Sequence, residues 1–465
     1  MKKLLLLVLL LFTAITNAQD ITGDWYGQLT FPGGKLRIGL HITKTANGYT
    51  GTMDSPDQGA NGIPLTTVAF ENNIFAFAIP QGGINYKGTP EGAAIKGMFT
   101  QNGTSIPLNF GRSEIKNEAP KRPQEPKKPY PYYEEEVAFA NDKAGISLGG
   151  TLTLPKQGGS NYPAVILISG SGPQNRDEEI LGHKSFLIIA DYLTRQGIAV
   201  LRYDDRGVGK STGKFSTATT ADFATDAEAA FAYLKTRKDI NTKKIGFIGH
   251  SEGGIIAPIV AANHPDAAFI VLLAGTAIPG DELMLLQNYL MAKANGMPEE
   301  DLAKLGNINK GIYTIIKEED NPAVLKTRLR AAFNKDLKPL LISKGIPEEQ
   351  VANNIDSQLS DFTTPWYINF IRYNPYAVLE KVKCPILALN GDKDVQVAPK
   401  ANLDAIRRAA NKSGNKNVTT KELPGLNHLF QTSATGNPAE YGDIEETFSP
   451  AALKIVGDWI AQQVK

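Results

Sequence analysis

The chain has very few of the residues that build disulfides and metal sites, with one cysteine and five histidines among 465 residues. Because Cys384 is alone, an internal disulfide is excluded even in an oxidising compartment. The histidines lack the spacing of metal ligands. We therefore expect neither a metal ion nor any other cofactor.

An excess of charge of either sign is also missing. The chain carries 49 basic and 48 acidic residues, so its formal net charge is +1. A nearly neutral protein has no general electrostatic attraction to nucleic acid or to anionic membranes. We expect a small-molecule or peptide partner and no nucleic acid, and a homo-oligomer is compatible with this composition.

The N-terminus has no apolar run long enough to span a bilayer comfortably, because Leu4–Phe12 is too short. Lys2 and Lys3 precede this run, and small and polar residues up to Ala18 follow it. This pattern predicts that residues 1–18 are a secretory signal peptide, with an uncleaved anchor as the alternative. The mature protein would then be exported, periplasmic or secreted, without a membrane span.

Residues 19–112 are typical of an all-β domain. Short apolar stretches are separated by Gly, Asn and Pro, and they comprise Leu36–Ile42, Thr67–Phe70, Ile74–Ile79 and Ile95–Thr100. Such spacing predicts a small antiparallel barrel or sandwich. The opening segment Gly23–Gly27 resembles the start of lipocalin-like barrels, but nothing in this region indicates its role.

Residues 113–133 are predicted to form a linker. Five prolines lie between Ala119 and Pro131, among many Lys, Arg and Glu residues. This composition favours an extended backbone and cannot pack a core.

From residue 134 to 465 the pattern changes to alternating strands and helices. Five buried strands are predicted, at Ala164–Ile168, Ile198–Tyr203, Lys244–Gly249, Phe269–Ala274 and Pro385–Asn390. This alternation predicts a doubly wound, mostly parallel sheet of the α/β class. Residues from about 278 to 378 contain only helical patterns, so we expect a helical cap inserted over one end of the sheet.

A serine motif lies between one of these strands and a helix. Gly249-His250-Ser251-Glu252-Gly253 follows an apolar strand, as in the nucleophile elbow of α/β hydrolases. A side chain at either flanking glycine would clash in such a sharp turn. The sequence therefore predicts Ser251 as a nucleophile.

A serine hydroxyl needs a neighbouring base. Three histidines are poorly placed by their sequence context: His41, His250 and His264. His183 is a second candidate, but His428 stands after a predicted strand and before the last helix, where the order serine, acid, histidine puts the base. We predict His428 as the general base.

The orienting acid is expected after the strand that ends near Asn390. Asp392 and Asp394 both lie there, between the serine and the histidine in chain order. In this fold the acid typically stands three residues after the loop glycine, Gly391, which favours Asp394 and leaves Asp392 as the alternative.

The loop after the first core strand, Ser169–Asp177, supplies the remaining part of a predicted oxyanion hole. The backbone N–H groups of Ser171 and Glu252 are the candidate donors. Gly209-Lys210-Ser211-Thr212 lacks the glycine spacing of a phosphate-binding loop, so we interpret it as a turn.

These motifs resemble those of EstD-like bacterial carboxylesterases, which are related to serine aminopeptidase-like α/β hydrolases. The similarity extends from about residue 134 to the C-terminus. It rests on the serine motif and three other segments, Gly170–Asp177, Arg202–Ser211 and Pro424–His428. Ser169 stands where many relatives have histidine, and Asn175 where the group often has aspartate.

The resemblance implies ester hydrolysis through an acyl-enzyme formed on Ser251. One alternative is a peptidase that uses the same triad and holds the substrate ammonium with cap carboxylates, the candidates being Glu282, Glu318, Glu319, Asp320 and Asp361. A second alternative is a binding protein without catalytic activity. Four aromatic residues recur at helical spacing and predict either core packing or an acyl pocket: Trp366, Tyr367, Phe370 and Tyr373.

Overall fold

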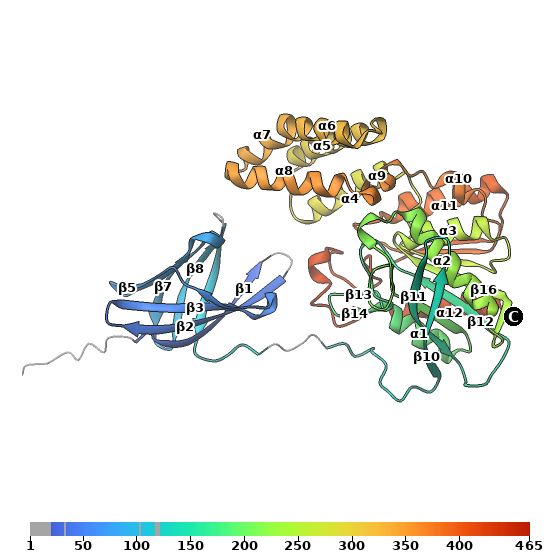
Figure 1. The fold of residues 1–465 in the computed structure, drawn as a ribbon, viewed down its shortest axis with the longest axis horizontal. Helices are drawn as coiled ribbons and strands as arrows, with labels where there is room; N and C mark the ends of the chain where they lie inside the picture. The colour runs from blue at the N-terminus through green and yellow to red at the C-terminus, as the bar shows by residue number, and fades with distance from the viewer. Residues whose placement is uncertain (1–19, 32–33, 102–103, 117–120) are drawn as a thin grey trace, which may run out of the picture. The chain divides into compact units, whose positions relative to one another are not determined.

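The computed structural model describes residues 20–31, 34–101, 104–116 and 121–465 (Figure 1). The chain divides into two compact units, residues 1–119 and residues 120–465. The predicted signal peptide, residues 1–18, lies outside the described residues. Within these ranges, no helix combines the length and the apolar character that crossing a bilayer requires.

The first unit contains one antiparallel sheet of nine strands. The strands are β1 (Gly23–Phe31), β2 (Gly34–Thr45), β3 (Gly48–Ser55), β4 (Ala60–Pro64), β5 (Thr67–Glu71), β6 (Ile74–Ile79), β7 (Ile84–Glu91), β8 (Ala94–Gln101) and β9 (Thr104–Gly111). Their order is β4-β3-β2-β1-β9-β8-β7-β6-β5, so the two edge strands follow each other in the chain. Between them, the N–H of Leu65 donates to Gly51 of β3 and the N–H of Thr66 donates to Ala78 of β6. The sheet is therefore curled on itself, which confirms the barrel-like prediction.

The core of this curled sheet follows from the alternation of its side chains. Along β7, Ile84 and Tyr86 are buried while Asn85 and Lys87 are exposed. Successive strand residues point to opposite faces, so every second side chain enters the interior. Aromatic side chains dominate this core, with Phe77 stacked on Tyr86 at a centroid distance of 5.2 Å.

The second unit is built on an eight-stranded sheet in the order β10-β11-β15-β12-β16-β17-β18-β19. Its strands are β10 (Tyr133–Asn141), β11 (Ile146–Leu154), β12 (Tyr162–Ile168), β15 (Ala199–Tyr203), β16 (Ile240–His250), β17 (Ile270–Leu273), β18 (Ile386–Gly391) and β19 (Val418–Leu423). The pairings β10–β11 and β11–β15 are antiparallel, and the five others are parallel. This arrangement confirms the predicted mostly parallel sheet of an α/β-hydrolase fold.

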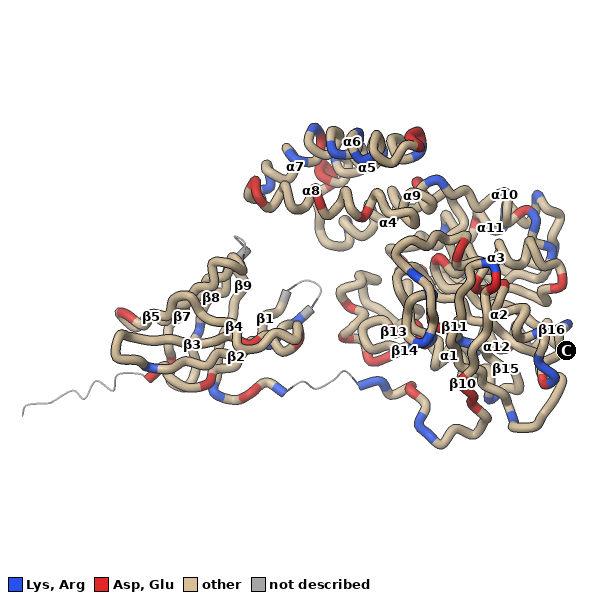
Figure 2. Tube along the Cα trace, in the orientation of Figure 1, with Lys and Arg blue, Asp and Glu red and all other residues tan. Residues whose placement is uncertain are grey.

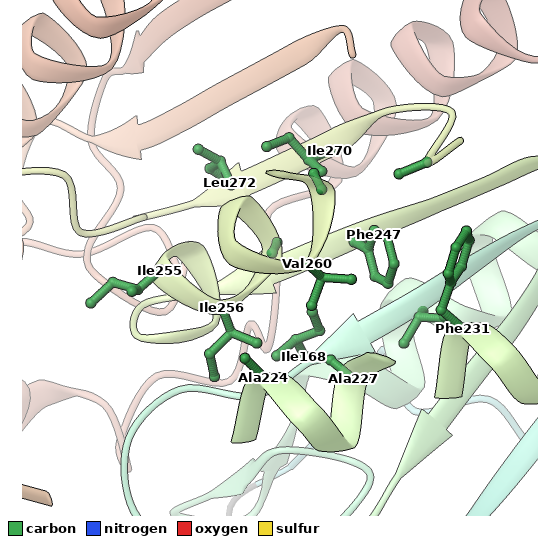
Figure 3. Close-up of a cluster of buried hydrophobic side chains, with 14 of the residues drawn as sticks. Ile168, Ala224, Ala227, Phe231, Phe247, Ile255, Ile256, Val260, Ile270 and Leu272 are labelled. Atoms are coloured by element: carbon green, nitrogen blue, oxygen red, sulfur yellow. The ribbon is translucent and has the colours of Figure 1, made fainter. Parts of the chain in front are cut away.

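Helices cover both faces of this sheet. Ala164, Ile166 and Ile168 of β12 face α2 (Thr220–Thr236) and α3 (Gly253–Asn263), as Figure 3 shows for Ile168. Helix α11 (Pro399–Ser413) extends the same core over β18 and β19. Val165 and Leu167 pack on the other face with α1 (Ser185–Arg195) and α12 (Pro450–Gln463). Because both faces are buried, the strand is apolar throughout and not alternating.

A helical insertion separates β17 from β18, as predicted for the cap. It contains α4 (Gly280–Ala294), α5 (Glu299–Glu318), α6 (Pro322–Ala332), a π-helix (Phe333–Leu337), α7 (Lys338–Ser343), α8 (Glu348–Phe362), α9 (Pro365–Arg372) and α10 (Tyr376–Leu379). Apolar residues of α5, α6, α8 and α9 form a separate core. Charged residues of both signs occur along α5 to α8 (Figure 2), as expected for helices with a solvated face.

Part of the predicted linker packs against the second unit. The guanidinium of Arg122 donates to four backbone carbonyls, those of Leu181, Gly182, Gly442 and Ile444. Gln124 donates to Phe448 O and accepts from the N–H groups of Thr447 and Phe448. Residues 121–132 are therefore not a free spacer. The side chains of Arg122 and Gln124 hold this segment by bonding to backbone groups of the second unit, and the composition does not reveal these bonds.

The packing of the sheet allows a stability prediction. Phe247 is fully buried between β16 and the helices of one face (Figure 3). We expect Phe247→Ala to lower the free energy of unfolding of the second unit by about 3–5 kcal/mol, because it leaves a cavity. Val324→Ala, at a side chain that is 44% exposed, should change it by less than about 0.5 kcal/mol. Urea denaturation measures both, and equal losses would contradict this view of the core.

Candidate active site

The predicted nucleophile lies on a strained turn between β16 and α3. Ser251 has φ of 52°, and its N–H donates to Leu273 O of the neighbouring strand at 2.9 Å. A positive φ is unfavourable for any residue with a Cβ, so the surroundings must hold it. A Cβ on Gly249 would lie 2.0 Å from Gly253 O, and one on Gly253 would lie 2.2 Å from Ile168 O. Both flanking glycines are required, as the sequence motif indicated.

The predicted acid and base are in contact. Asp394 follows the end of β18, and its Oδ2 lies 2.8 Å from His428 Nδ1. Its other oxygen accepts the backbone N–H groups of Gln396 and Val397, both at 2.8 Å. These bonds fix the carboxylate, which in turn orients the imidazole so that Nε2 is available as a base. Asp394 and His428 are both buried.

The alternative acid has a different contact. Asp392 Oδ1 accepts the N–H of Gly425 at 2.7 Å. This bond tethers the loop that leads from β19 to His428. Asp392 therefore supports the backbone of that loop, whereas Asp394 contacts the imidazole.

The other histidines lie elsewhere. His183 is buried in β14 (His183–Lys184), with Nδ1 2.9 Å from Thr447 Oγ1 and Nε2 2.8 Å from Tyr441 O, and burial lowers its pKa. His264 ends α3, and His41 belongs to the first unit. His250, next to the serine, is buried and turned toward Glu178.

Ser251 lines a cavity of about 90 Å³ together with both predicted oxyanion residues. The remaining lining residues are Thr276, Leu283, Met284, Gln287, Trp366, Phe370, Gln396 and Val397. Among the described residues, the backbone N–H groups of Ser171 and Glu252 donate to no protein acceptor. Both groups are therefore free to stabilise negative charge on a substrate oxygen.

Helix α9 divides the four aromatic residues of the sequence motif between two roles. Trp366 and Phe370, one helical turn apart, line the cavity and stack on each other with centroids 5.0 Å apart. Tyr367 packs into the cap core, and Tyr373 packs against the main sheet core. Both interpretations of the sequence thus apply: all four residues pack against a core, and Trp366 and Phe370 also line the cavity.

The carboxylate of Glu252 joins the serine turn to the cap, a contact that the sequence did not reveal. Its Oε1 accepts from Trp366 Nε1 at 2.8 Å and from Thr220 Oγ1 at 2.6 Å. Burial raises the pKa of Glu252, although both hydrogen bonds oppose the increase. The sequence motif had indicated only a backbone role for this residue.

The segment at the end of β15 clamps the predicted oxyanion loop. Asp204 accepts from the backbone and the guanidinium of Arg176, with Oδ2 2.7 Å from Nη2. Arg202 forms an ion pair with Asp177. The N–H of Lys210 donates to Asp204 Oδ2, which explains Gly209–Thr212 as a turn. These charge-assisted bonds hold the loop from both sides.

Comparison with known proteins agrees with this architecture. The sequence model of the family described as Serine aminopeptidase, S33 matches residues 184–316, which include Ser251. The chain is similar to Esterase EstD of Thermotoga maritima, with 27% identity over 311 residues covering 67% of this chain and 65% of that protein. The chain thus spans just under two thirds of the length of this relative.

Similarity to solved structures is more distant. Est1E from Butyrivibrio proteoclasticus is 18% identical, with a TM-score of 0.40 over 70% of this chain and 96% of that chain. The esterase Pf2001 of Pyrococcus furiosus is 15% identical, with a TM-score of 0.44 over 76% of this chain and 100% of that chain.

Asp205 carries an unusual charge state beside the cavity. Its pKa is raised to about 7, mainly by burial. The hydrogen bonds from Gln174 N–H and Ser169 Oγ lower this pKa in part, and the nearby carboxyl groups of Glu178 and Glu252 raise it. The folded protein therefore holds a proton that the unfolded chain releases near pH 3.8. The contribution of Asp205 to folding stability therefore falls as the pH rises from about 4 to 7. Above pH 7 this contribution is fully lost.

This charge state predicts a pH-dependent effect of Asp205→Asn. The amide keeps an acceptor for the Gln174 N–H but has no charge to bury. We expect the Tm of the variant relative to wild type to be several degrees higher at pH 8 than at pH 5. Differential scanning calorimetry at both pH values tests this, and a Tm difference that does not change with pH would contradict the protonated carboxyl.

Proposed function

This chain is an α/β hydrolase by its fold, and on that premise we propose that it is an exported serine esterase acting through an acyl-enzyme. Ser251 attacks the ester carbonyl while His428 takes its proton. The N–H groups of Ser171 and Glu252 bind the oxyanion, and Asp394 stabilises the imidazolium. His428 then protonates the leaving alcohol and activates the water that releases the acid.

One observation carries the proposal. The serine on its strained turn shares a cavity with both free N–H groups and with Gln396 and Val397, whose own N–H groups hold the Asp394 carboxylate. Nucleophile, oxyanion donors and acid thus meet at one end of the sheet. Similarity to Esterase EstD supports ester substrates for this arrangement.

Ester cleavage is favoured over peptide cleavage by the charges around the cavity. An aminopeptidase needs a carboxylate to hold the substrate ammonium. None of the five cap carboxylates that the sequence offered is among the described residues lining the cavity. Glu252 does line it, but its carboxyl oxygen Oε1 already accepts from Trp366 and Thr220. Glu318 and Glu319 pair with Arg328, and Asp320 pairs with Arg372.

The cavity favours short acyl groups. Its volume is only about 90 Å³. Leu283, Met284, Trp366 and Phe370 form the larger part of its apolar wall, and about half of the lining is polar. We therefore propose small aliphatic esters, such as acetates to butyrates, as the substrate class.

Two further points belong to the proposal. Export rests on the basic and apolar start of the chain, residues 1–18. A binding protein without catalytic activity is disfavoured, because such a protein has no use for a serine on a strained turn and a histidine oriented by a buried carboxylate.

The catalytic assignment predicts a graded set of losses. With p-nitrophenyl acetate, we expect Ser251→Ala and His428→Gln to lower kcat/KM at least about 10³-fold, since each removes a group that acts in the chemical step. Asp394→Asn should cost about 10²–10⁴-fold, because the amide no longer stabilises the imidazolium.

Asp392→Asn is the matched control, since its amide oxygen still accepts the N–H of Gly425. It should stay within about threefold of wild type. If Asp392→Asn lost as much activity as Asp394→Asn, or if Ser251→Ala kept its activity, the assignment of the triad would be wrong. An aminoacyl anilide cleaved better than the esters would instead favour the peptidase.

The proposed acyl pocket can be tested by enlarging it. Phe370→Ala opens the wall facing Ser251, so we expect kcat/KM for p-nitrophenyl octanoate relative to acetate to rise about tenfold or more. Ile371→Val, on the face of α9 that packs into the cap core, should leave this ratio unchanged. An unchanged ratio in Phe370→Ala would exclude this cavity as the acyl site.

A further inference from the structure

His250, the residue before the nucleophile, is buried between two hydrogen-bond acceptors. Its Nε2 lies 3.0 Å from the backbone oxygen of His428, and its Nδ1 lies 2.9 Å from Glu178 Oε1. A carbonyl oxygen only accepts, so Nε2 must carry a proton. A neutral imidazole would then present a bare Nδ1 to a carboxyl oxygen, which needs a proton between the two atoms.

Glu178 is placed to supply the opposite charge. It is 2% exposed, and the same Oε1 also accepts the N–H of Gly170 at 2.8 Å. A carboxylate oxygen can accept both the Gly170 N–H and a protonated Nδ1 of His250. Of the two groups that share the proton, imidazole is the stronger base, so the proton resides on His250.

The pair connects the two sides of the cavity. Through Gly170 it holds the oxyanion loop, where a Cβ on Gly170 would lie 3.2 Å from the Cβ of Ser251. Through His250 Nε2 it holds the backbone of His428, whose loop lies outside any helix or strand between β19 and α12. One buried pair thus fixes the base and the oxyanion loop relative to each other.

We propose that Glu178 keeps His250 as an imidazolium and that this pair is the positioning element for His428 and the oxyanion loop. The proposal rests on the proposed function, because it takes His428 as the catalytic base. His250 and Glu178 touch no substrate, so both are positioning residues. The ring of His250 is also a near neighbour of the ring of His428.

The imidazolium lies close to the catalytic ring, with the centroids of His250 and His428 4.9 Å apart. Burial lowers the pKa of His250, but the charge and hydrogen bond of Glu178 and the bond to the His428 carbonyl together raise it above its ordinary value. The charged groups around the two rings are Glu178 and Asp394. Glu178 lies at Nδ1 of His250, and the backbone oxygen of His428 lies at Nε2.

The protonation state can be measured without turnover. In the full chain labelled with ¹⁵N-histidine, the signals of His250 are assigned by their loss in His250→Gln. We expect both ring nitrogens of His250 to carry protons at pH 7 to 8 and to show an imidazolium spectrum. A bare ring nitrogen at pH 7 would overturn the proposal, whatever the protein does with esters.

Substitution of Glu178 tests the electrostatic part. Glu178→Gln keeps the shape and can donate to Nδ1 of a neutral His250. We expect a neutral His250 ring by NMR in this variant. The exposed neighbour gives the matched control, Glu179→Gln, in which His250 should keep its imidazolium spectrum. An imidazolium spectrum that persists in Glu178→Gln would overturn the proposal.

Substitution of His250 tests the positioning part. His250→Phe removes the donor to the His428 carbonyl, so we expect kcat to fall about tenfold or more while KM stays within about threefold. His250→Gln retains an N–H donor at similar reach and should recover most of the loss. Equal activity of the two variants would overturn the role of this bond. If wild type turned over no ester, the proposed function would fail, and the NMR result would still decide the imidazolium.

Discussion

The turn at Ser251 is the constraint on which the catalytic end of the second unit depends. Its positive φ exists only because β16, α3 and β17 approach too closely for side chains at the neighbouring glycines. A Cβ on Gly254 would lie 2.4 Å from the Cα of Gly275, beyond the end of β17. The close packing of β16, α3 and β17 thus stabilises the strained backbone of Ser251. It also allows α3 to begin two residues after the serine.

Around this turn the protein buries many charged groups, which is costly unless each has a partner of opposite charge. Most of these groups have such a partner. Asp204 meets Arg176, Arg202 meets Asp177 and Arg206 meets Asp226. Asp205 has no cation among its hydrogen-bond partners and responds to burial with a raised pKa. The pairs at Arg176 and Asp177 also hold the loop that carries Ser171, the predicted oxyanion donor.

The cap contributes part of the wall of the cavity at Ser251. It has its own apolar core, and α9 turns one face to that core and the other to the cavity. The hydrogen bond from Trp366 to Glu252 ties this helix to the residue after Ser251. Side chains on α4 and α9 therefore line the cavity, while Ser251 and Asp394 follow strands of the sheet. In the proposed esterase, the sheet would hold the reacting groups and the cap would shape the acyl pocket.

Local pattern was enough to predict the strands and the serine turn. The apolar runs of β12 and β16 and the glycines around Ser251 express constraints within a few residues. Asp394 and His428 were predicted from their order in the chain after Ser251, which the resemblance to a known fold supplied. Only the tertiary structure decided which polar groups meet. Trp366 and Glu252 are 114 residues apart, and His250 and Glu178 are 72 residues apart. No local pattern encodes such pairs, because they arise when loops from separate strands converge at one edge of the sheet. The docking of Arg122 onto residues more than 300 positions away has the same cause.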